Sequence, residues 1–198
     1  MKINLKTNLF IKTTTVIYTV LLIISLYLKI GKATLAPIEY YSFIFFLSLS
    51  YILMLIYLIS VLKTLKEHKS VINVFIIFTC LEAAKIILGL FSLGVHSNSY
   101  IMGLGTLSAI IGMYLMIQTF NIKSPYIAVP YRVFGGSLLV SVGAFLYLTS
   151  SSPVVANSNT KDYLDIVKIL IPIAVLFILK NVERFIKGQN VRNIQATV

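Results

Sequence analysis

The feature that most constrains this chain is an apolar run from Val71 to Gly94 that carries a carboxylate and an amine near its middle. As a helix, its 24 residues span roughly 36 Å, which is enough to cross the hydrocarbon core of a bilayer with some tilt. Glu82 and Lys85 then lie at membrane depth, and because they are three residues apart they share one helix face and can neutralise each other. The run therefore predicts a transmembrane helix with one polar face turned into a protein interior.

The overall composition also indicates a membrane protein. Of the 198 residues, 58% are hydrophobic and 12% are charged, whereas soluble proteins have roughly 45 to 50% apolar residues and roughly 25% charged ones. A soluble domain of this length would lack the charges needed to cover its surface. We therefore expect an all-α, polytopic integral membrane protein in which residues 1–198 form a single transmembrane domain, a bundle of six transmembrane helices.

Six apolar segments supply the expected helices, and a basic cytoplasmic tail follows them over 182–198. A loop bounded by proline separates the fourth and fifth segments at 121–130, and Pro172 in the middle of the sixth predicts a kink. The predicted spans are 13–30, 41–62, 71–94, 99–120, 131–149 and 163–181.

The first span has an alternative interpretation as a cleaved signal peptide, because a basic start precedes its apolar middle. Cleavage after small residues would fall after Ala36, and Pro37 would then follow the cut. We favour an uncleaved first helix. With five spans the termini would lie on opposite sides of the membrane, and the basic residues would be less clearly separated between the two sides.

The basic residues predict the orientation of the chain. With six spans, twelve lysines and arginines fall on one side of the membrane and three on the other. By the positive-inside rule, both termini are then cytoplasmic, and we expect a bacterial inner or cytoplasmic membrane. The same distribution accounts for the net charge of +11 without nucleic acid as a partner. The twelve are Lys2, Lys6, Lys12, Lys63, Lys66, Lys69, Lys123, Arg132, Lys180, Arg184, Lys187 and Arg192, and the three are Lys29, Lys32 and Lys161.

A second acid and base pair, Asp165 and Lys168, repeats the spacing of Glu82 and Lys85 in the sixth span. In the six-span topology both lysines lie roughly 10 to 13 Å below the outer ends of their helices. If the third and sixth helices are adjacent, these four residues form one candidate site for ligand binding or ion coupling. A charge at the bilayer centre costs about 2.5 to 3.5 kcal/mol on insertion scales, so such residues often mark ion paths or ligand sites. The alternative to a functional role is an ion pair that only stabilises the packing of two helices. We favour this structural role for Asp165 and Lys168.

Small residues recur on the third, fourth and fifth spans at helical spacing. Glycine and serine on one face let a neighbouring helix approach closely. We therefore predict that these three helices pack together through the residues Gly89, Gly105, Ser108, Gly112, Gly136, Ser137 and Ser141.

The sequence gives no sign of catalysis, a cofactor or a metal site. It has no Gly-x-Ser-x-Gly elbow and no His-Glu-x-x-His helix, and a lone Cys80 excludes an intrachain disulfide or a thiolate zinc site. His68 and His96 fall in loops that we place on opposite faces of the membrane, which argues against a haem between helices. We interpret the basic segment 63–70 around His68 as a solvated turn.

These observations favour a membrane protein that is not an enzyme and that binds or transports a small solute or ion through Glu82 and Lys85. The alternative is a non-catalytic accessory or assembly subunit whose small-residue faces pack against another membrane protein or a second copy of the chain. A lipid-modifying enzyme is the weakest interpretation. In each case the lipid bilayer is the one partner that the composition requires.

Overall fold

The computed structural model describes residues 3–31, 37–91, 98–150 and 165–195. All regular structure in these ranges is helical, which confirms the predicted all-α class. The elements are α1 (Leu5–Ile30), α2 (Pro37–Thr64), α3 (Lys69–Phe91), α4 (Asn98–Thr119), α5 (Pro125–Ser150), the 3-10 helix η1 (Asp165–Ile169) and α7 (Leu170–Gln195), which continues directly from η1.

Four of the described helices are long and apolar enough to cross a membrane. Large apolar side chains cover the outside of the protein, and Leu9, Phe46 and Ile117 are each more than half exposed. Contiguous apolar surface of this kind is unfavourable in water, so it is a surface for contact with lipid. The chain is therefore a multi-pass helical membrane protein. The four candidate spans cover Leu5–Leu28, Glu39–Thr64, Lys69–Leu90 and Pro125–Gly143, and the described apolar part of α4, Gly103–Thr119, is shorter.

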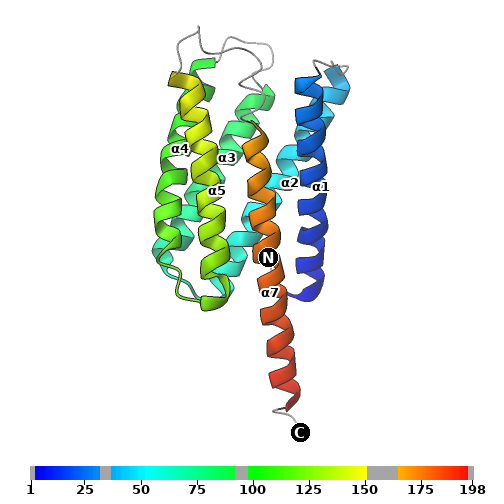
Figure 1. Ribbon diagram of the computed structural model, residues 1–198, viewed down its shortest axis with the longest axis vertical. Coiled ribbons are helices and arrows are strands. Elements are labelled where there is room, and N and C mark those ends of the chain that lie inside the picture. Colours follow the sequence, from blue (N-terminus) through cyan, green and yellow to red (C-terminus); the bar gives the residue numbers. More distant parts are fainter. Residues whose placement is uncertain (1–2, 32–36, 92–97, 151–164, 196–198) are drawn as a thin grey trace.

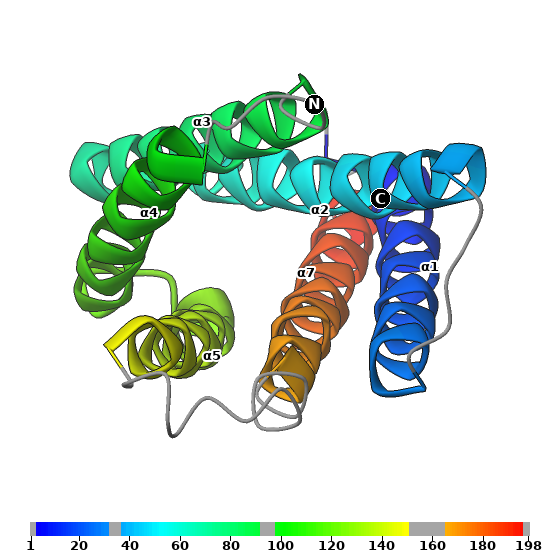
Figure 2. The ribbon, with the colours of Figure 1, turned by 90° about the horizontal axis from the view of Figure 1, so that it is seen from above.

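The helices form a closed ring in the order of the sequence. Each helix packs against the next, from α1 to α5 and then α7, and α7 packs against α1 to complete the ring (Figure 2). Neighbouring helices run in opposite directions (Figure 1). The third, fourth and fifth predicted helices are thus consecutive neighbours, as expected, whereas the neighbours of α3 are α2 and α4 and those of α7 are α5 and α1.

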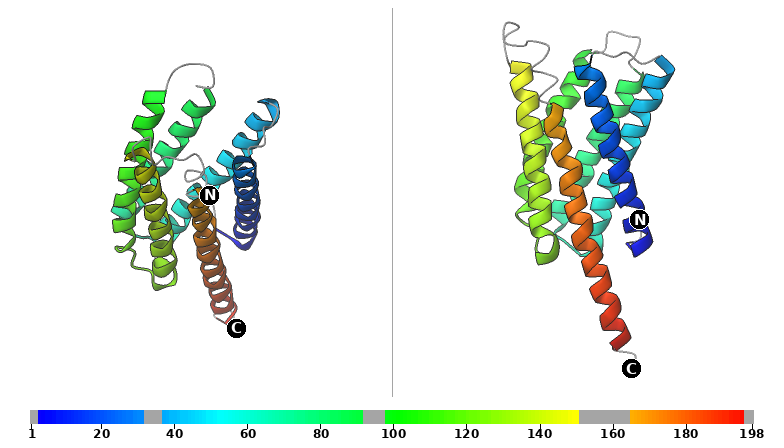
Figure 3. Two further views of the ribbon diagram at one scale, coloured as in Figure 1. Left: turned by 45° about the horizontal axis from the view of Figure 1, so that its top comes forward. Right: turned by 45° about the vertical axis from the view of Figure 1, so that its right-hand side comes forward.

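Four of the predicted cytoplasmic segments lie at the same end of the ring. This end holds the start of α1, the turn from α2 to α3, the turn from α4 to α5, and the C-terminal part of α7 (Figure 1). Figure 3 shows from two further directions that α7 extends beyond the other helices here. We call it the basic end, because the described members of the predicted cytoplasmic set lie here, including Lys63, Lys66, Lys69, Lys123 and Lys187.

Aromatic side chains connect α2, α3 and α5 across the ring. Phe75 of α3 packs against Tyr131 and Phe134 of α5, with ring centroids 5.5 and 6.0 Å apart. The Tyr131 hydroxyl donates a hydrogen bond of 2.8 Å to the carbonyl oxygen of Leu58 in α2. These three aromatic side chains are fully or almost fully buried, so both their area and the tyrosine hydrogen bond stabilise the ring.

A buried asparagine closes the ring between α1, α2 and α7. Asn8 is 1% exposed, its Nδ2 donates to the carbonyl oxygen of Leu179, and its Oδ1 accepts a hydrogen bond of 2.8 Å from the Tyr57 hydroxyl. One turn further along α1, Lys12 forms an ion pair of 2.7 Å with Glu183. Polar contacts therefore fix the first helix to the last.

The turn between α2 and α3 is not the fully solvated segment that its charges predict. Lys66 adopts a left-handed backbone conformation with φ of 54°, and the next residue, Glu67, is 6% exposed. Its carboxylate accepts hydrogen bonds of 2.8 Å from the backbone N–H groups of Lys123 and Ser124, which immediately precede α5. A carboxylate at this position satisfies donors that the helix cannot satisfy itself and complements the helix dipole.

Several helix boundaries differ from the predicted ones. The helix α1 begins at Leu5 rather than at 13, because Asn4 and Thr7 cap it reciprocally with their side-chain oxygens. The predicted loop over 121–130 is correct only up to Ser124, since Pro125 is the first residue of α5, a position that tolerates proline.

The sixth predicted helix also differs from expectation near its proline. Pro172 is the third residue of α7, directly after η1, so it lies at the start of the α-helix and not in its middle. Proline is tolerated in a first turn because those N–H groups have no partner within the helix. The helix α7 then continues through most of the predicted basic tail, to Gln195.

The helices α4 and α5 approach each other closely at Gly135. A Cβ atom there would lie 3.1 Å from the Cα of Met116 and 3.2 Å from side-chain atoms of Thr119. At Gly112 a Cβ would make ordinary contacts of 3.5 and 3.6 Å, and at Gly89 and Gly136 nothing lies within 4 Å. Gly136 was the predicted packing residue, whereas the tight position is its neighbour Gly135.

We predict that Gly135→Ala destabilises the protein by about 1 to 3 kcal/mol, because the added methyl group requires Met116 and Thr119 of α4 to move by a few tenths of an ångström. The matched control is Gly136→Ala, which adds the same group into open space and gains helix propensity, so it should be neutral or stabilising by up to about 1 kcal/mol. The measurement is the free energy of unfolding in mixed micelles. Equal effects of the two substitutions would contradict the close approach at Gly135.

We also predict that Glu67→Ala lowers the free energy of unfolding by about 1 to 3 kcal/mol, because it leaves the N–H groups of Lys123 and Ser124 without their acceptor. Glu67→Gln retains one acceptor oxygen and should cost less. The control is His68→Ala at the exposed neighbouring position, which should change little. Thermal unfolding of the four purified proteins in one detergent measures this order, and a His68 variant as unstable as Glu67→Ala would refute it.

Candidate functional site

The apolar helix α3 places Glu82 inside the ring. Glu82 is 7% exposed and Thr79, one turn earlier on the same face, is 8% exposed, whereas Ile77 and Cys80 lie on the exposed face. The Thr79 hydroxyl donates to the carbonyl oxygen of Phe75 within its own helix. The polar face that the sequence predicts in this run therefore does turn toward the protein interior.

The carboxylate of Glu82 receives two charge-assisted hydrogen bonds at one oxygen. Lys85 Nζ lies 2.6 Å from Glu82 Oε1, which confirms the pairing expected from their three-residue spacing. The Ser108 hydroxyl, from α4, donates to the same oxygen. Ser108 is 3% exposed and was selected from the sequence only for helix packing. The structure makes it a polar partner of Glu82 that joins α3 to α4.

Two tyrosines from α1 and α2 complete the surroundings of this carboxylate. Tyr18 and Tyr51 stack with ring centroids 5.7 Å apart and planes 21° apart, and both lie close enough to Glu82 for its charge to act on them. Among the residues that the structure describes, none forms a hydrogen bond with either hydroxyl. Neither tyrosine was predicted as a site residue, because a tyrosine in an apolar helix carries no periodic signal that separates it from lipid-facing aromatic residues.

Side chains of α3 and α4 thus meet at Glu82, and the stacked tyrosines of α1 and α2 lie within range of its charge. We treat these groups as one polar site. It holds a carboxylate, an ammonium group, a hydroxyl and two phenols, which together offer both hydrogen-bond donors and acceptors. The charges of Glu82 and Lys85 cancel, so the site is neutral overall. Glu82 is the buried partner and Lys85 is the more accessible one, with 33% of its side chain exposed. The ammonium group can therefore donate to a ligand while it remains near the carboxylate.

The second predicted pair lies elsewhere in the ring. Asp165 and Lys168 belong to η1, which packs against α1, α5 and α7, whereas α3 packs against α2 and α4. Lys168 is exposed, and the side chain of Asp165 lies outside the part of the chain described at side-chain level. The structure brings Glu82 and Lys85 together, but it does not make the helices of the two pairs neighbours.

The remaining predicted packing residues have local roles. Ser137 donates to the carbonyl oxygen of Phe134, and Ser141 donates to that of Ser137, so both hydroxyls are satisfied within α5. Gly105 is half-buried in α4, one turn before Ser108. Because these groups are satisfied or apolar, they add no ligand-binding capacity to the site around Glu82.

Metal ligands do not cluster in the described ranges. No group of three or more histidine, cysteine, aspartate or glutamate side chains that could hold a metal ion occurs among the residues of 3–31, 37–91, 98–150 and 165–195 that the structure describes. Cys80 is exposed, and His96 lies outside these ranges.

Comparison of the chain with models of protein families, with curated proteins and with solved structures gave no match.

We predict that Lys85→Met destabilises the protein by about 1 to 3 kcal/mol at neutral pH, because it leaves the buried Glu82 carboxylate without its counter-charge. The double variant Glu82→Gln with Lys85→Met should recover most of this loss, since no unpaired charge remains. Lys63→Met, at an exposed site, is the control. The measurement is the free energy of unfolding of the wild type, Glu82→Gln, Lys85→Met, the double variant and the control. Additive losses of the two single variants in the double variant would contradict a direct pair.

Proposed function

We propose that this protein binds and transports a small polar solute or ion at membrane depth, with Glu82 and Lys85 as the binding and coupling pair. In this proposal α4 and α7 also cross the bilayer, which gives six spans, and the basic end faces the cytoplasm of a bacterial cell. Both termini are then cytoplasmic, in accord with the excess of lysine and arginine at that end.

The observation that carries the proposal is the convergence of Glu82, Lys85 and Ser108 with the tyrosine pair of α1 and α2. A lock between α3 and α4 requires only the hydrogen bond from Ser108 to Glu82. The additional phenols and the partly exposed ammonium group supply polar capacity beyond that lock, in a region where polar groups are costly. Such excess capacity is typical of a site that exchanges its own contacts for those of a ligand.

The arrangement also gives a physical route to coupling. When Glu82 takes up a proton, its carboxylate charge is lost and the Lys85 ammonium group becomes available to an anionic group of a ligand. When Glu82 releases the proton, it again attracts Lys85 and competes with that ligand. Proton binding and anion binding therefore favour each other, and by linkage the effect is reciprocal.

The test is native mass spectrometry of the full-length protein extracted gently from its host membrane. We expect a reproducible small-molecule adduct on the wild-type protein that is lost in Glu82→Gln, a substitution of nearly equal size that cannot carry the charge. Glu39→Gln, which neutralises an exposed carboxylate at the start of α2, is the matched control and should retain the adduct. Circular dichroism checks that all three proteins are equally helical.

Two results would overturn the proposal. An adduct retained unchanged in Glu82→Gln would remove the pair from ligand binding. A stoichiometric protein partner with no small ligand would instead favour the alternative, a non-catalytic accessory subunit, in which Glu82 and Ser108 only join two helices. Proteoliposomes with a trapped pH-sensitive dye then test coupling, because proton uptake should be lost in Glu82→Gln and kept in Glu39→Gln.

A further inference from the structure

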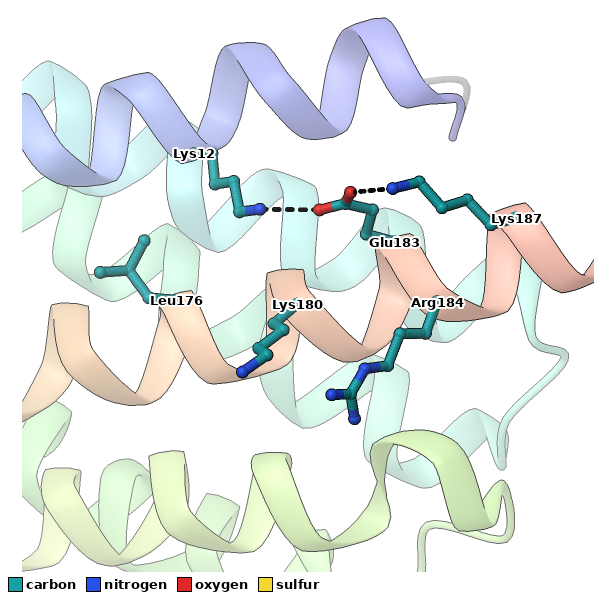
Figure 4. Close-up of a pocket in the computed structure, with 6 residues that line it drawn as sticks. All are labelled: Lys12, Leu176, Lys180, Glu183, Arg184 and Lys187. Carbon is teal, nitrogen blue, oxygen red and sulfur yellow. Dashed lines mark hydrogen bonds and ion pairs between the residues drawn. The ribbon is translucent and has the colours of Figure 1, made fainter.

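A second polar feature, separate from the site around Glu82, lies between α1 and α7 at the basic end. It is a pocket of about 460 Å³ (Figure 4). Its lining combines one apolar side chain with four basic ones and one carboxylate. These residues are Leu176, Lys12, Lys180, Arg184, Lys187 and Glu183.

The carboxylate in this pocket is fully engaged by two of the lysines. Lys12 Nζ lies 2.7 Å from Glu183 Oε2, and Lys187 Nζ lies 2.7 Å from Glu183 Oε1. The hydrogen bonds from Lys12 and then Lys187, reinforced by their charges, lower the pKa of Glu183 to about 2. Glu183 is therefore ionised at neutral pH, and both of its oxygens already have a partner.

The other two basic side chains of the pocket have no such partner. Lys180 and Arg184 are four residues apart, so they lie on the same face of α7. Figure 4 shows both extending from α7 away from the contact between Lys12 and Glu183. Within the described part of the chain neither forms an ion pair. The pocket therefore has an excess of positive charge, concentrated on these two residues.

The pocket also lies where the apolar part of α7 ends. Leu176 lines the pocket, and the next residue, Phe177, is 42% exposed. Beyond Leu179 the helix becomes basic, and it extends past the other helices (Figure 1). A molecule in this pocket thus meets cations at one end and apolar surface at the other, which is the polarity of a phospholipid at a membrane surface.

We propose that this pocket binds the phosphate-bearing headgroup of an anionic phospholipid, with Lys180 and Arg184 holding the phosphate and Leu176 beside the acyl chains. The planar guanidinium group of Arg184 can donate two parallel hydrogen bonds to phosphate oxygens, and Lys180 adds a compact charge one turn away. Basic pockets between helices at the cytoplasmic surface are suited to such headgroups. This inference does not depend on the function proposed for Glu82.

The test titrates the purified full-length protein in detergent with phosphatidylglycerol or phosphatidylcholine and measures retained lipid by native mass spectrometry. We expect the wild-type protein to retain phosphatidylglycerol in preference to phosphatidylcholine. The double variant Lys180→Gln with Arg184→Gln should bind phosphatidylglycerol about tenfold more weakly. The matched control, Lys63→Gln with Lys69→Gln, removes the same charge from exposed sites at the basic end and should bind as the wild type does.

Each arm has a result that would overturn the inference. Equal retention of phosphatidylglycerol by wild type and double variant would exclude Lys180 and Arg184 as headgroup contacts. Equal retention of both lipids would indicate apolar contact without headgroup recognition. A third arm replaces lipid with inorganic phosphate, and thermal stabilisation by phosphate with no preference for phosphatidylglycerol would mean that the ligand is soluble.

Discussion

The buried carboxylate of Glu82 sets the main physical constraint on this protein. In a helix that faces lipid, an ionised side chain has to meet its partners inside the protein, because the hydrocarbon core offers none. Lys85 supplies the counter-charge from one turn away and Ser108 supplies a second hydrogen bond from the next helix. The orientation of α3 and its contact with α4 both follow from this requirement, and so does the position of the polar site inside the ring.

The same requirement is met differently at the basic end. There, Glu67 caps the start of α5 across the turn, and Asn8 links α1 to α2 and α7. These contacts join segments far apart in the sequence and close the ring where water is nearest. Contacts at this end therefore hold helices from both ends of the chain in register.

The two candidate sites differ in the kind of ligand that their chemistry suits. Around Glu82 the charges cancel and five polar groups converge from α1 to α4, which suits a small polar molecule that exchanges with the protein's own contacts. Between α1 and α7 the positive charge is in excess and borders apolar surface, which suits a lipid headgroup. The helix α1 contributes to both sites, with Tyr18 near Glu82 and Lys12 in the pocket beside α7. A lipid that restricts the motion of α1 would therefore also restrict the motion of Tyr18.

The sequence by itself determined the helical class, the apolar runs, the gathering of basic residues and the pairing of Glu82 with Lys85, because each depends on local composition or on spacing within one helix. Only the tertiary structure decided which helices are neighbours. The arrangement of the helices brought Ser108 and Tyr18 close to Glu82. It also placed Glu67 at the start of a helix 56 residues further along the chain. Finally, it made Gly135 the tight position, whereas the sequence favoured Gly136. Contacts between distant segments depend on how helices rotate and pack, and a single hydrophobic pattern does not encode that rotation.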